Sequence, residues 1–173
     1  LSNNINIGKS LVEKDLVEEA KNIQKKANQY NCTIILPTDV VCGKSLEDKN
    51  PCEMSINEIT SDFMILDLGK KTTEIINKEI TNSRMVLWNG PVGAFEYKPY
   101  DKASKEIAIY IKENAKKNNI TALAGGGDTI SSIKNANAED GFDYISNAGG
   151  AFLEWLEGNQ SPGVIAIKEN NFI

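Results

Sequence analysis

The chain of 173 residues contains no histidine. Histidine is the commonest general base and the commonest transition-metal ligand, so its absence leaves chemistry that relies on positioning, on charge and on hard cations. The chain also lacks any apolar run approaching the roughly 20 residues that cross a bilayer, and no basic and apolar leader opens it. We therefore expect a cytoplasmic protein with no membrane partner.

Cysteine is scarce, and negative charge exceeds positive charge. The three cysteines are Cys32, Cys42 and Cys52, and their odd number and spacing match neither a zinc site nor a dense disulfide scaffold. We expect free thiols in a reducing compartment. The net charge of -5 argues against a nucleic-acid partner.

The remaining composition is that of an ordinary globular protein. Hydrophobic residues make up 40% and charged residues 25% of the chain, and its length is typical of one domain. We expect residues 1–173 to form a single domain with its own core.

Short apolar runs alternate with amphipathic stretches along most of the chain. We expect strands at 33–36, 63–67, 84–88, 120–124, 144–145 and 164–167, and helices at 10–30, 72–80, 101–117, 128–136 and 151–157. Ser10 and Glu13 form a capping box for the first helix, and residues 43–61 are expected to be a connecting loop. Strands that are apolar throughout are buried on both faces. The pattern predicts an α/β fold, a doubly wound and mostly parallel sheet with helices on both faces, as in a three-layer, Rossmann-like sandwich.

Unusual residues gather where these strands end. In doubly wound sheets, ligands bind beyond the carboxyl ends of the strands. The residues at those ends are Asp67, Asn89, Gly125 to Asp128, Gly149 and Gly150.

The strongest candidate site is the run from Gly125 to Thr129, "GGGDT". Glycines let a backbone approach a phosphate, and the following helix start attracts anions. Asp128 could hold Mg²⁺ beside that phosphate. A tight turn with Asp128 or Thr129 as the helix cap explains the spacing about equally well, although three glycines exceed what a turn requires.

Three weaker candidates flank it. The loop from Asn89 to Glu96 contains Pro91 and ends in an acid that could accept both hydroxyls of a ribose, or could simply be solvated. Gly149 and Gly150 also precede a helix, and they form a second, weaker candidate for a glycine-rich helix start that attracts anions.

In the fourth candidate, Gly69 supplies a turn and Thr72 caps the next helix. Lys70 and Lys71 either meet phosphate or form a solvated pair.

Two familiar nucleotide-binding motifs are not present. Gly8-Lys9-Ser10 and Gly43-Lys44-Ser45 resemble the end of a Walker A loop but lack its earlier glycine. The glycine spacing of the dinucleotide-binding motif also fails, which disfavours a nicotinamide-dependent oxidoreductase.

Several blocks in order resemble phosphoglycerate kinase. They are "GKSLVEKDL" from Gly8, Leu36 to Val41, "LDLGKKT" from Leu66, "WNGPVGAFE" from Trp88, "GGGDT" from Gly125 and the ending "ISNAGGAFLEWLEGNQSPGVIAI". The resemblance covers nearly the whole chain and only the second, nucleotide-binding half of the family. It implies a fragment that lacks the N-terminal domain and the opening strand and helix of the nucleotide domain.

The resemblance implies phosphoryl transfer between 1,3-bisphosphoglycerate and ADP in glycolysis, with Mg²⁺ bound to ADP or ATP. The triose substrate would be bound by the missing N-terminal domain, and the full-length enzyme would be a monomer. Glu96 would bind the ribose and Asp128 the metal, with Gly126 and Gly127 at the reacting phosphate. The other nucleotide contacts would be Asn89, Pro91, Gly125, Thr129, Gly149 and Gly150.

The chain departs from the family at two places. Lys70 stands where the family usually has proline, and Asn147-Ala148 stands where it usually has Thr-Gly. A phosphate or hinge role for Asn147 or Ala148 does not carry over, because a methyl group restricts the backbone. Two functions of different class remain: half of an enzyme that needs its missing domain, and a nucleotide-binding module without turnover.

Overall fold

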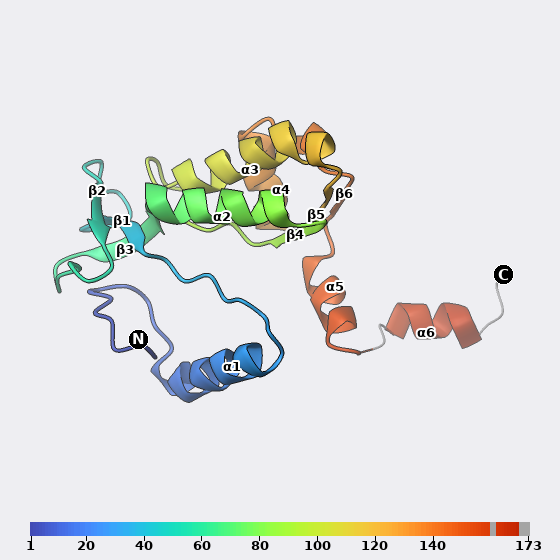
Figure 1. Cartoon of the computed structure of the whole chain (residues 1–173), viewed down its shortest axis with the longest axis horizontal. Coiled ribbons are helices and arrows are strands. Elements are labelled where there is room, and N and C mark those ends of the chain that lie inside the picture. The colour runs from blue at the N-terminus through green and yellow to red at the C-terminus, as the bar shows by residue number, and fades with distance from the viewer. Residues whose placement is uncertain (160–161, 170–173) are drawn as a thin grey trace. The chain divides into compact units, whose positions relative to one another are not determined.

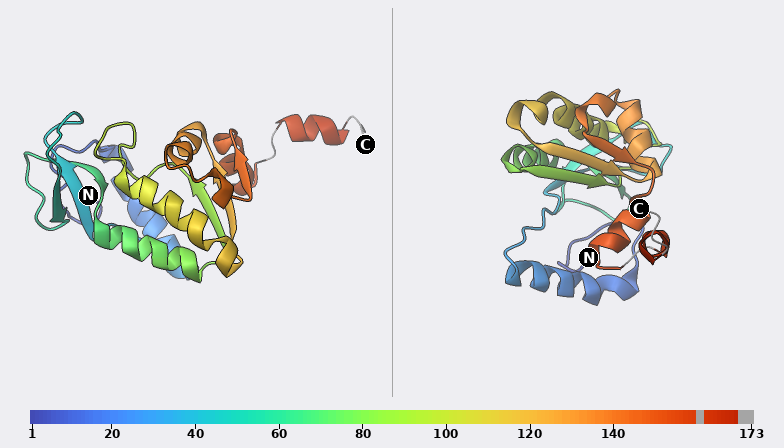
Figure 2. Two further views of the ribbon diagram at one scale, coloured as in Figure 1. Left: turned by 90° about the horizontal axis from the view of Figure 1, so that it is seen from above. Right: turned by 90° about the vertical axis from the view of Figure 1, so that its right-hand side faces the viewer.

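The computed structural model describes residues 1–159 and 162–169 (Figures 1 and 2). The chain divides into two compact units. The first contains Leu1–Asn82 and Val92–Ile107, and the second contains Ser83–Pro91 and Ala108–Ile173. Helix α3 (Lys102–Asn114) begins in the first unit and ends in the second.

The first unit is built on an antiparallel sheet. Its strands are β1 (Asp39–Gly43), β2 (Cys52–Ser55) and β3 (Met64–Leu68), in the order β2-β1-β3. Val40 and Cys42 alternate toward one face, where they are buried with Ile59. The expectation of one mostly parallel sheet is therefore wrong for this unit, and residues 43–61 contain a strand rather than only a loop.

Of the two helices of the first unit, one starts close to its expected position and the other starts well after the expected Ser10. Helix α2 (Lys70–Asn82) follows β3, and α1 (Val17–Gln29) follows a 3-10 turn at Lys14–Leu16. The capping box is wrong, because the Ser10 hydroxyl accepts a hydrogen bond from the Ile65 amide at 2.8 Å and donates to the Ile7 carbonyl at 2.6 Å. Ser10 thus anchors the chain to β3 instead of starting a helix.

The strand expected at 33–36 is absent. These residues adopt no regular structure, and Ile34, Ile35 and Leu36 are 40%, 37% and 46% exposed. Helix α1 buries none of its residues. An apolar run forms a strand only against a neighbour, and residues 33–36 pair with no strand in the described ranges.

The second unit contains the parallel sheet that the sequence predicts. Strands β4 (Met85–Asn89), β5 (Thr121–Gly125) and β6 (Tyr144–Ser146) are parallel in the order β4-β5-β6. Helix α4 (Gly127–Asn135) and the second half of α3 cover one face of it (Figure 2). Trp88, Ala122, Ala124, Ile111 and Ile133 are buried in this layer.

The opposite face of the parallel sheet is only partly covered. Met85 and Tyr144 remain 60% and 65% exposed, so these strands are not buried on both faces as expected. The last helices are α5 (Gly149–Leu156), which confirms a prediction, and α6 (Pro162–Glu169), which replaces the strand expected at 164–167. Pro162 at the first helical position favours that helix. The fold is α/β, with one parallel and one antiparallel three-stranded sheet.

Across residues 1–159 and 162–169, every helix is too short or too polar to pass through a bilayer.

Candidate functional site

The ends of the three parallel strands lie side by side in the second unit. The register pairs Asn89 with Gly125, and Gly125 with Ser146. Each residue is the last of its strand. Ser146 did not stand out in the sequence, because the short strand that carries it holds only three residues.

Gly126 turns the chain from β5 into α4. Its φ of +95° lies in a region that other residues rarely adopt, and a Cβ added there would lie 3.2 Å from Asn89 Oδ1. The Gly126 amide donates to the Ser146 carbonyl at 3.0 Å, and its carbonyl accepts from the Ile130 amide at 3.0 Å. Glycine at this position lets the turn reach both neighbouring elements.

Gly149 packs against this turn. A Cβ added to Gly149 would lie 2.6 Å from Asn89 Oδ1 and 2.7 Å from the Gly126 nitrogen. By contrast, no atom lies within 4 Å of a Cβ added to Gly127 or Gly150. The structure therefore brings Asn89, Gly126 and Gly149 together and leaves open space above Gly127 and Gly150.

Helix α4 begins without a side-chain cap. Its N-cap residue is Gly126, and no side chain caps this helix start. Asp128 is exposed in the first turn, beside the positive end of the helix dipole. This start presents backbone amides and one carboxylate to solvent.

The Thr129 side chain, in contrast, is hydrogen-bonded within the protein. It is 1% exposed, and its hydroxyl oxygen accepts a hydrogen bond from the Gly90 amide at 2.6 Å. The Trp88 indole donates to the Gly90 carbonyl at 2.6 Å. Together these bonds fix the turn that leads from Asn89 to Pro91.

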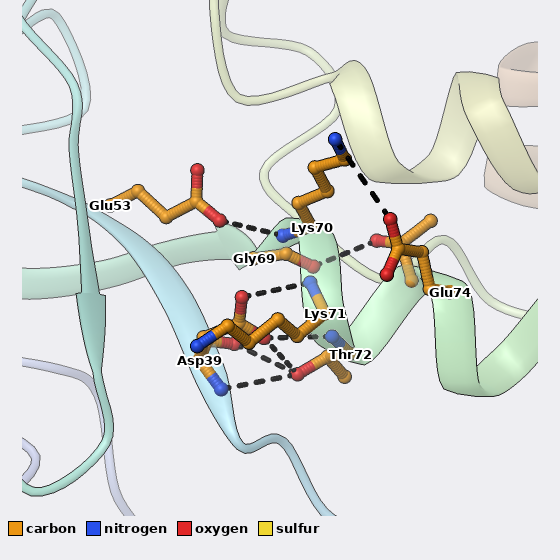
Figure 3. Close-up of polar contacts among 8 residues, drawn as sticks. Asp39, Glu53, Gly69, Lys70, Lys71, Thr72 and Glu74 are labelled. Carbon is orange, nitrogen blue, oxygen red and sulfur yellow. Dashed lines mark hydrogen bonds and ion pairs between the residues drawn. The ribbon is translucent and has the colours of Figure 1, made fainter.

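The free backbone amides at the start of α2, in the first unit, are hydrogen-bonded to side chains of the protein (Figure 3). The Lys70 amide donates to Glu53 at 2.8 Å, and the Lys71 and Thr72 amides donate to the Asp39 carboxylate at 2.9 and 2.7 Å. The carboxylates of Asp39 on β1 and Glu53 on β2 thus accept the backbone amides at this helix start, which could otherwise bind an anion. Thr72 is buried in the first turn rather than at the cap, so the prediction that it caps this helix is wrong.

Two lysines, Lys70 and Lys71, stand at the start of α2. Lys70 and Lys71 are exposed, and Lys70 lies 3.9 Å from Glu74. These contacts agree with the solvated alternative, and the phosphate alternative stays a prediction. Burial raises the pKa of Asp39, but hydrogen bonds from the Thr72 hydroxyl and from the Lys71 and Thr72 amides outweigh it, so the net pKa is lowered.

The Asp67 carboxylate is also hydrogen-bonded within the protein. It is 2% exposed, and its carboxylate accepts from the Leu68 amide at 2.9 Å and from the Ala103 amide at 3.0 Å. Burial raises the pKa of Asp67 to about 6, against the opposing effect of these amides. Asp67 thus joins the end of β3 to the start of α3 within the first unit, whereas the glycine-rich turn belongs to the second unit.

Glu96 belongs to the first unit. Its loop is tied to β3 by a hydrogen bond from the Ala94 amide to the Leu66 carbonyl at 2.8 Å, and the Glu96 side chain is exposed. Asn89, Pro91, Gly125, Gly126, Gly127, Asp128, Thr129, Gly149 and Gly150 belong to the second unit.

A cavity of about 360 Å³ adjoins the strand ends of the second unit. Leu87, Leu123 and Trp155 contribute apolar surface to it, and Gly125 and Ser146 lie at its border. Residues 1–159 and 162–169 contain no group of three or more His, Cys, Asp or Glu side chains that could hold a metal ion. Asp128 is an exposed carboxylate in the first turn of α4.

These features define an α/β protein whose glycine-rich turn lies at the carboxyl edge of a parallel sheet, the edge at which such folds bind ligands. The family model for phosphoglycerate kinase matches residues 1–159. The chain belongs to the phosphoglycerate kinase family.

Individual relatives agree with that assignment. The chain is 43% identical over 164 residues to phosphoglycerate kinase of Chelativorans sp. (strain BNC1), which covers 94% of this chain and 41% of the relative. The phosphoglycerate kinase of Methylorubrum extorquens (strain PA1) is 42% identical over 163 residues, with the same two coverages. The chain thus spans about two-fifths of the length of the curated relatives it matches.

Solved structures share the fold. The structure of phosphoglycerate kinase from Coxiella burnetii matches with a TM-score of 0.89 and 31% identity, covering 98% of this chain and 43% of that one. Phosphoglycerate kinase from Pyrococcus horikoshii OT3 matches in fold, with a TM-score of 0.79 at 24% identity.

Proposed function

We propose that this chain is the nucleotide-binding half of a phosphoglycerate kinase. The reaction is phosphoryl transfer between 1,3-bisphosphoglycerate and ADP, giving 3-phosphoglycerate and ATP. This chain holds ADP or ATP with Mg²⁺, and an N-terminal domain outside the 173 residues holds the triose. We place the full-length enzyme in the cytoplasm as a monomer.

One contrast between two helix starts carries the proposal. At α2, two carboxylates of the protein fill the place of an anion. At α4, no side chain caps the helix, and the space above Gly127 is open. A helix start of this kind binds phosphate through its amides and its dipole.

The open start also fits a magnesium-bound nucleotide. Magnesium is usually held by one or two carboxylates together with substrate phosphates. Asp128 supplies one exposed carboxylate beside the turn. When bound, the metal neutralises charge on the phosphates.

The residues of the chain position the nucleotide rather than react with it. The amides at the start of α4 hold the phosphates, Gly126 and Gly127 lie nearest the reacting group, and Asn89 and Gly149 fix the shape of the turn. Phosphoryl transfer depends mostly on such positioning and on charge stabilisation. An acyl phosphate needs no base for attack by ADP, which agrees with a chain that lacks histidine.

The remaining assignments follow the family resemblance. Glu96 accepts the ribose hydroxyls, Pro91 and Asn89 face the nucleotide, and Gly125 and Gly150 border the phosphates. Thr129 acts by fixing Gly90, since its hydroxyl oxygen already accepts the Gly90 amide.

Calorimetric titration with ADP, with and without Mg²⁺, tests the site. Asp128→Asn should weaken Mg-dependent binding about tenfold or more, as the loss of a charge-assisted contact does, and should leave metal-free binding nearly unchanged. Glu139→Gln, a change of an exposed acid in the same unit, is the matched control and should bind like wild type. Equal affinities for Asp128→Asn and wild type in Mg²⁺ would reject the metal role.

A coupled assay separates the enzyme half from a nucleotide-binding module without turnover. We expect no turnover by the chain alone and turnover after addition of the N-terminal domain of a relative. Turnover by the chain alone would contradict the need for the second domain. Nucleotide binding without turnover in the mixture would favour the module.

A further inference from the structure

Two cysteines of the first unit face each other across the antiparallel sheet. Cys42 on β1 pairs in register with Cys52 on β2. Directly opposite residues of a sheet point to the same face. Both thiols are free, and the third cysteine, Cys32, lies outside the sheet just after α1.

The hydrogen-bond pattern fixes the distance between the two backbones. The Ile56 amide donates to the Thr38 carbonyl at 3.3 Å, in the same register as the sheet. Every second pair from there is hydrogen-bonded, which includes Cys42 with Cys52. Such pairs have Cα atoms about 5.5 Å apart, within the 4.4–6.8 Å range of disulfides.

The Cβ atoms of this pair must approach slightly for a bond to form. Opposite Cβ atoms lie about 4.5–5.5 Å apart, whereas disulfides have them about 3.8 Å apart. Here β2 is an edge strand that pairs only with β1 among the described strands, so no second strand holds it in place. A bond formed with some strain is readily reduced, which is typical of regulatory disulfides.

The two thiols differ in exposure. Cys52 is exposed on the edge strand, whereas Cys42 is 0% exposed in the core with Val40 and Ile59. Burial raises the pKa of the Cys42 thiol, and the nearby charge of Cys52 raises it further. A small oxidant therefore meets Cys52 first, and Cys42 is held beside it as the second thiol.

We propose that Cys42 and Cys52 are a reversible oxidation site that closes into a disulfide. The Cys52 thiol reacts with a peroxide: a sulfur–oxygen bond forms, the peroxide O–O bond breaks, and the product is Cys52 sulfenic acid plus water or an alcohol. The Cys42 thiol then attacks the Cys52 sulfur, and the S–OH bond breaks. The hydroxyl leaves as water with the thiol proton. A dithiol reverses the reaction by exchange and is itself oxidised to a disulfide.

The bond would connect two parts of one helix start. Cys52 precedes Glu53, whose carboxylate accepts the Lys70 amide at the start of α2, and β1 carries Asp39, which accepts the next two amides. Oxidation thus ties the edge strand to the strand beside it. It should make the first unit harder to unfold, since a crosslink restricts the unfolded chain.

Native oxidation followed by peptide mapping tests the proposal. The folded 173-residue chain is treated with dilute hydrogen peroxide, alkylated under denaturing conditions and cleaved before aspartate. Asp15, Asp39, Asp48 and Asp62 place the three cysteines in three different peptides. We expect loss of two hydrogen atoms from the intact mass, a link between peptides 39–47 and 48–61, alkylated Cys32, and full recovery of thiols with dithiothreitol.

Three variants and an unfolded reference sharpen the result. Cys32→Ser should keep the link. Cys42→Ser should lose it and stop at sulfenic acid or higher oxides of Cys52, whereas Cys52→Ser should lose it and leave the buried Cys42 as a thiol. The same chain oxidised in urea should give all three pairings, which shows that the native pairing comes from the fold. Links that involve Cys32 in the folded chain, crosslinked dimers as the main product, or no link in Cys32→Ser would overturn the proposal.

Discussion

The hydroxyl of Thr72 donates to the carboxylate of Asp39 at 2.6 Å, and the Thr72 amide donates to the same oxygen at 2.7 Å. Asp39 is 6% exposed and lies on β1, 33 residues before Thr72 in the helix whose start it caps. Gly69 makes the contact feasible, because a Cβ at that position would collide with the Asp39 carboxylate. A single side chain therefore joins the sheet of the first unit to α2.

Asp39→Ala should lower the free energy of unfolding by about 2–4 kcal/mol, because it leaves the buried amide and hydroxyl of Thr72 and the part-buried amide of Lys71 without their acceptor. Urea unfolding measures this change. Asp62→Ala, a change of an exposed aspartate in the same unit, should stay within about 0.5 kcal/mol of wild type. Equal losses in the two variants would contradict the capping role.

Asp67 should give stability a pH dependence of unusual sign. Its pKa is raised in the fold from 3.8 to about 6, so the folded state binds its proton more tightly than the unfolded state. The resulting stabilisation is fully present below pH 3.8 and is lost as pH rises to about 6. A shift of about two pKa units corresponds to roughly 3 kcal/mol.

Asp67→Asn removes this titration, so the stability of wild type relative to Asp67→Asn should fall between pH 4 and pH 6. The comparison between variants is needed because Asp39, whose pKa is lowered, contributes the opposite trend at lower pH. Urea unfolding at several pH values measures the difference. A constant difference across that range would show that Asp67 does not titrate there.

Local patterns predicted the elements that pack against neighbours present in the chain. Strands β3 to β6 and helices α2 to α5 appear within a few residues of their expected positions. Residues 33–36 show the limit of such patterns: their apolar run resembles a strand, yet Ile34 and Leu36 are exposed and pair with nothing in the described ranges. Apolar character alone does not specify a partner.

The candidate site was partly predictable for a similar reason. Glycines at strand ends indicate Gly125 to Gly127 and Gly149 directly, since each affects the backbone locally. The roles of Asp39 and Glu53 at α2 depend on contacts across 33 and 17 residues, which no local spacing encodes. Asp67 was mistaken for an edge residue because its acceptor role depends on Ala103, which is 36 residues away.

Gly149 and Gly150 offer a matched pair of substitutions at the start of α5. Gly149→Ala should destabilise the chain by about 1–3 kcal/mol, because its Cβ would press on Asn89 and on the Gly126 backbone. Gly150→Ala has open space and should be neutral or stabilising by up to about 1 kcal/mol. Thermal or urea unfolding of both variants measures the difference, and equal stabilities would contradict the close packing of Gly149 on the turn.

The proposed role of Glu96 leads to a prediction about the ribose. If its carboxylate accepts the two ribose hydroxyls, Glu96→Gln should weaken ADP binding about tenfold, as the loss of charged hydrogen bonds does. The same variant should bind 2′,3′-dideoxy-ADP as wild type does, because that nucleotide lacks both donors. Glu47→Gln, another exposed acid of the first unit, should affect neither nucleotide. Titration calorimetry of wild type, Glu96→Gln and Glu47→Gln with both nucleotides isolates the interaction energy between the Glu96 carboxylate and the ribose hydroxyls. An equal loss for ADP and the dideoxy nucleotide would mean that Glu96 acts through general charge or folding, and the ribose assignment would be withdrawn.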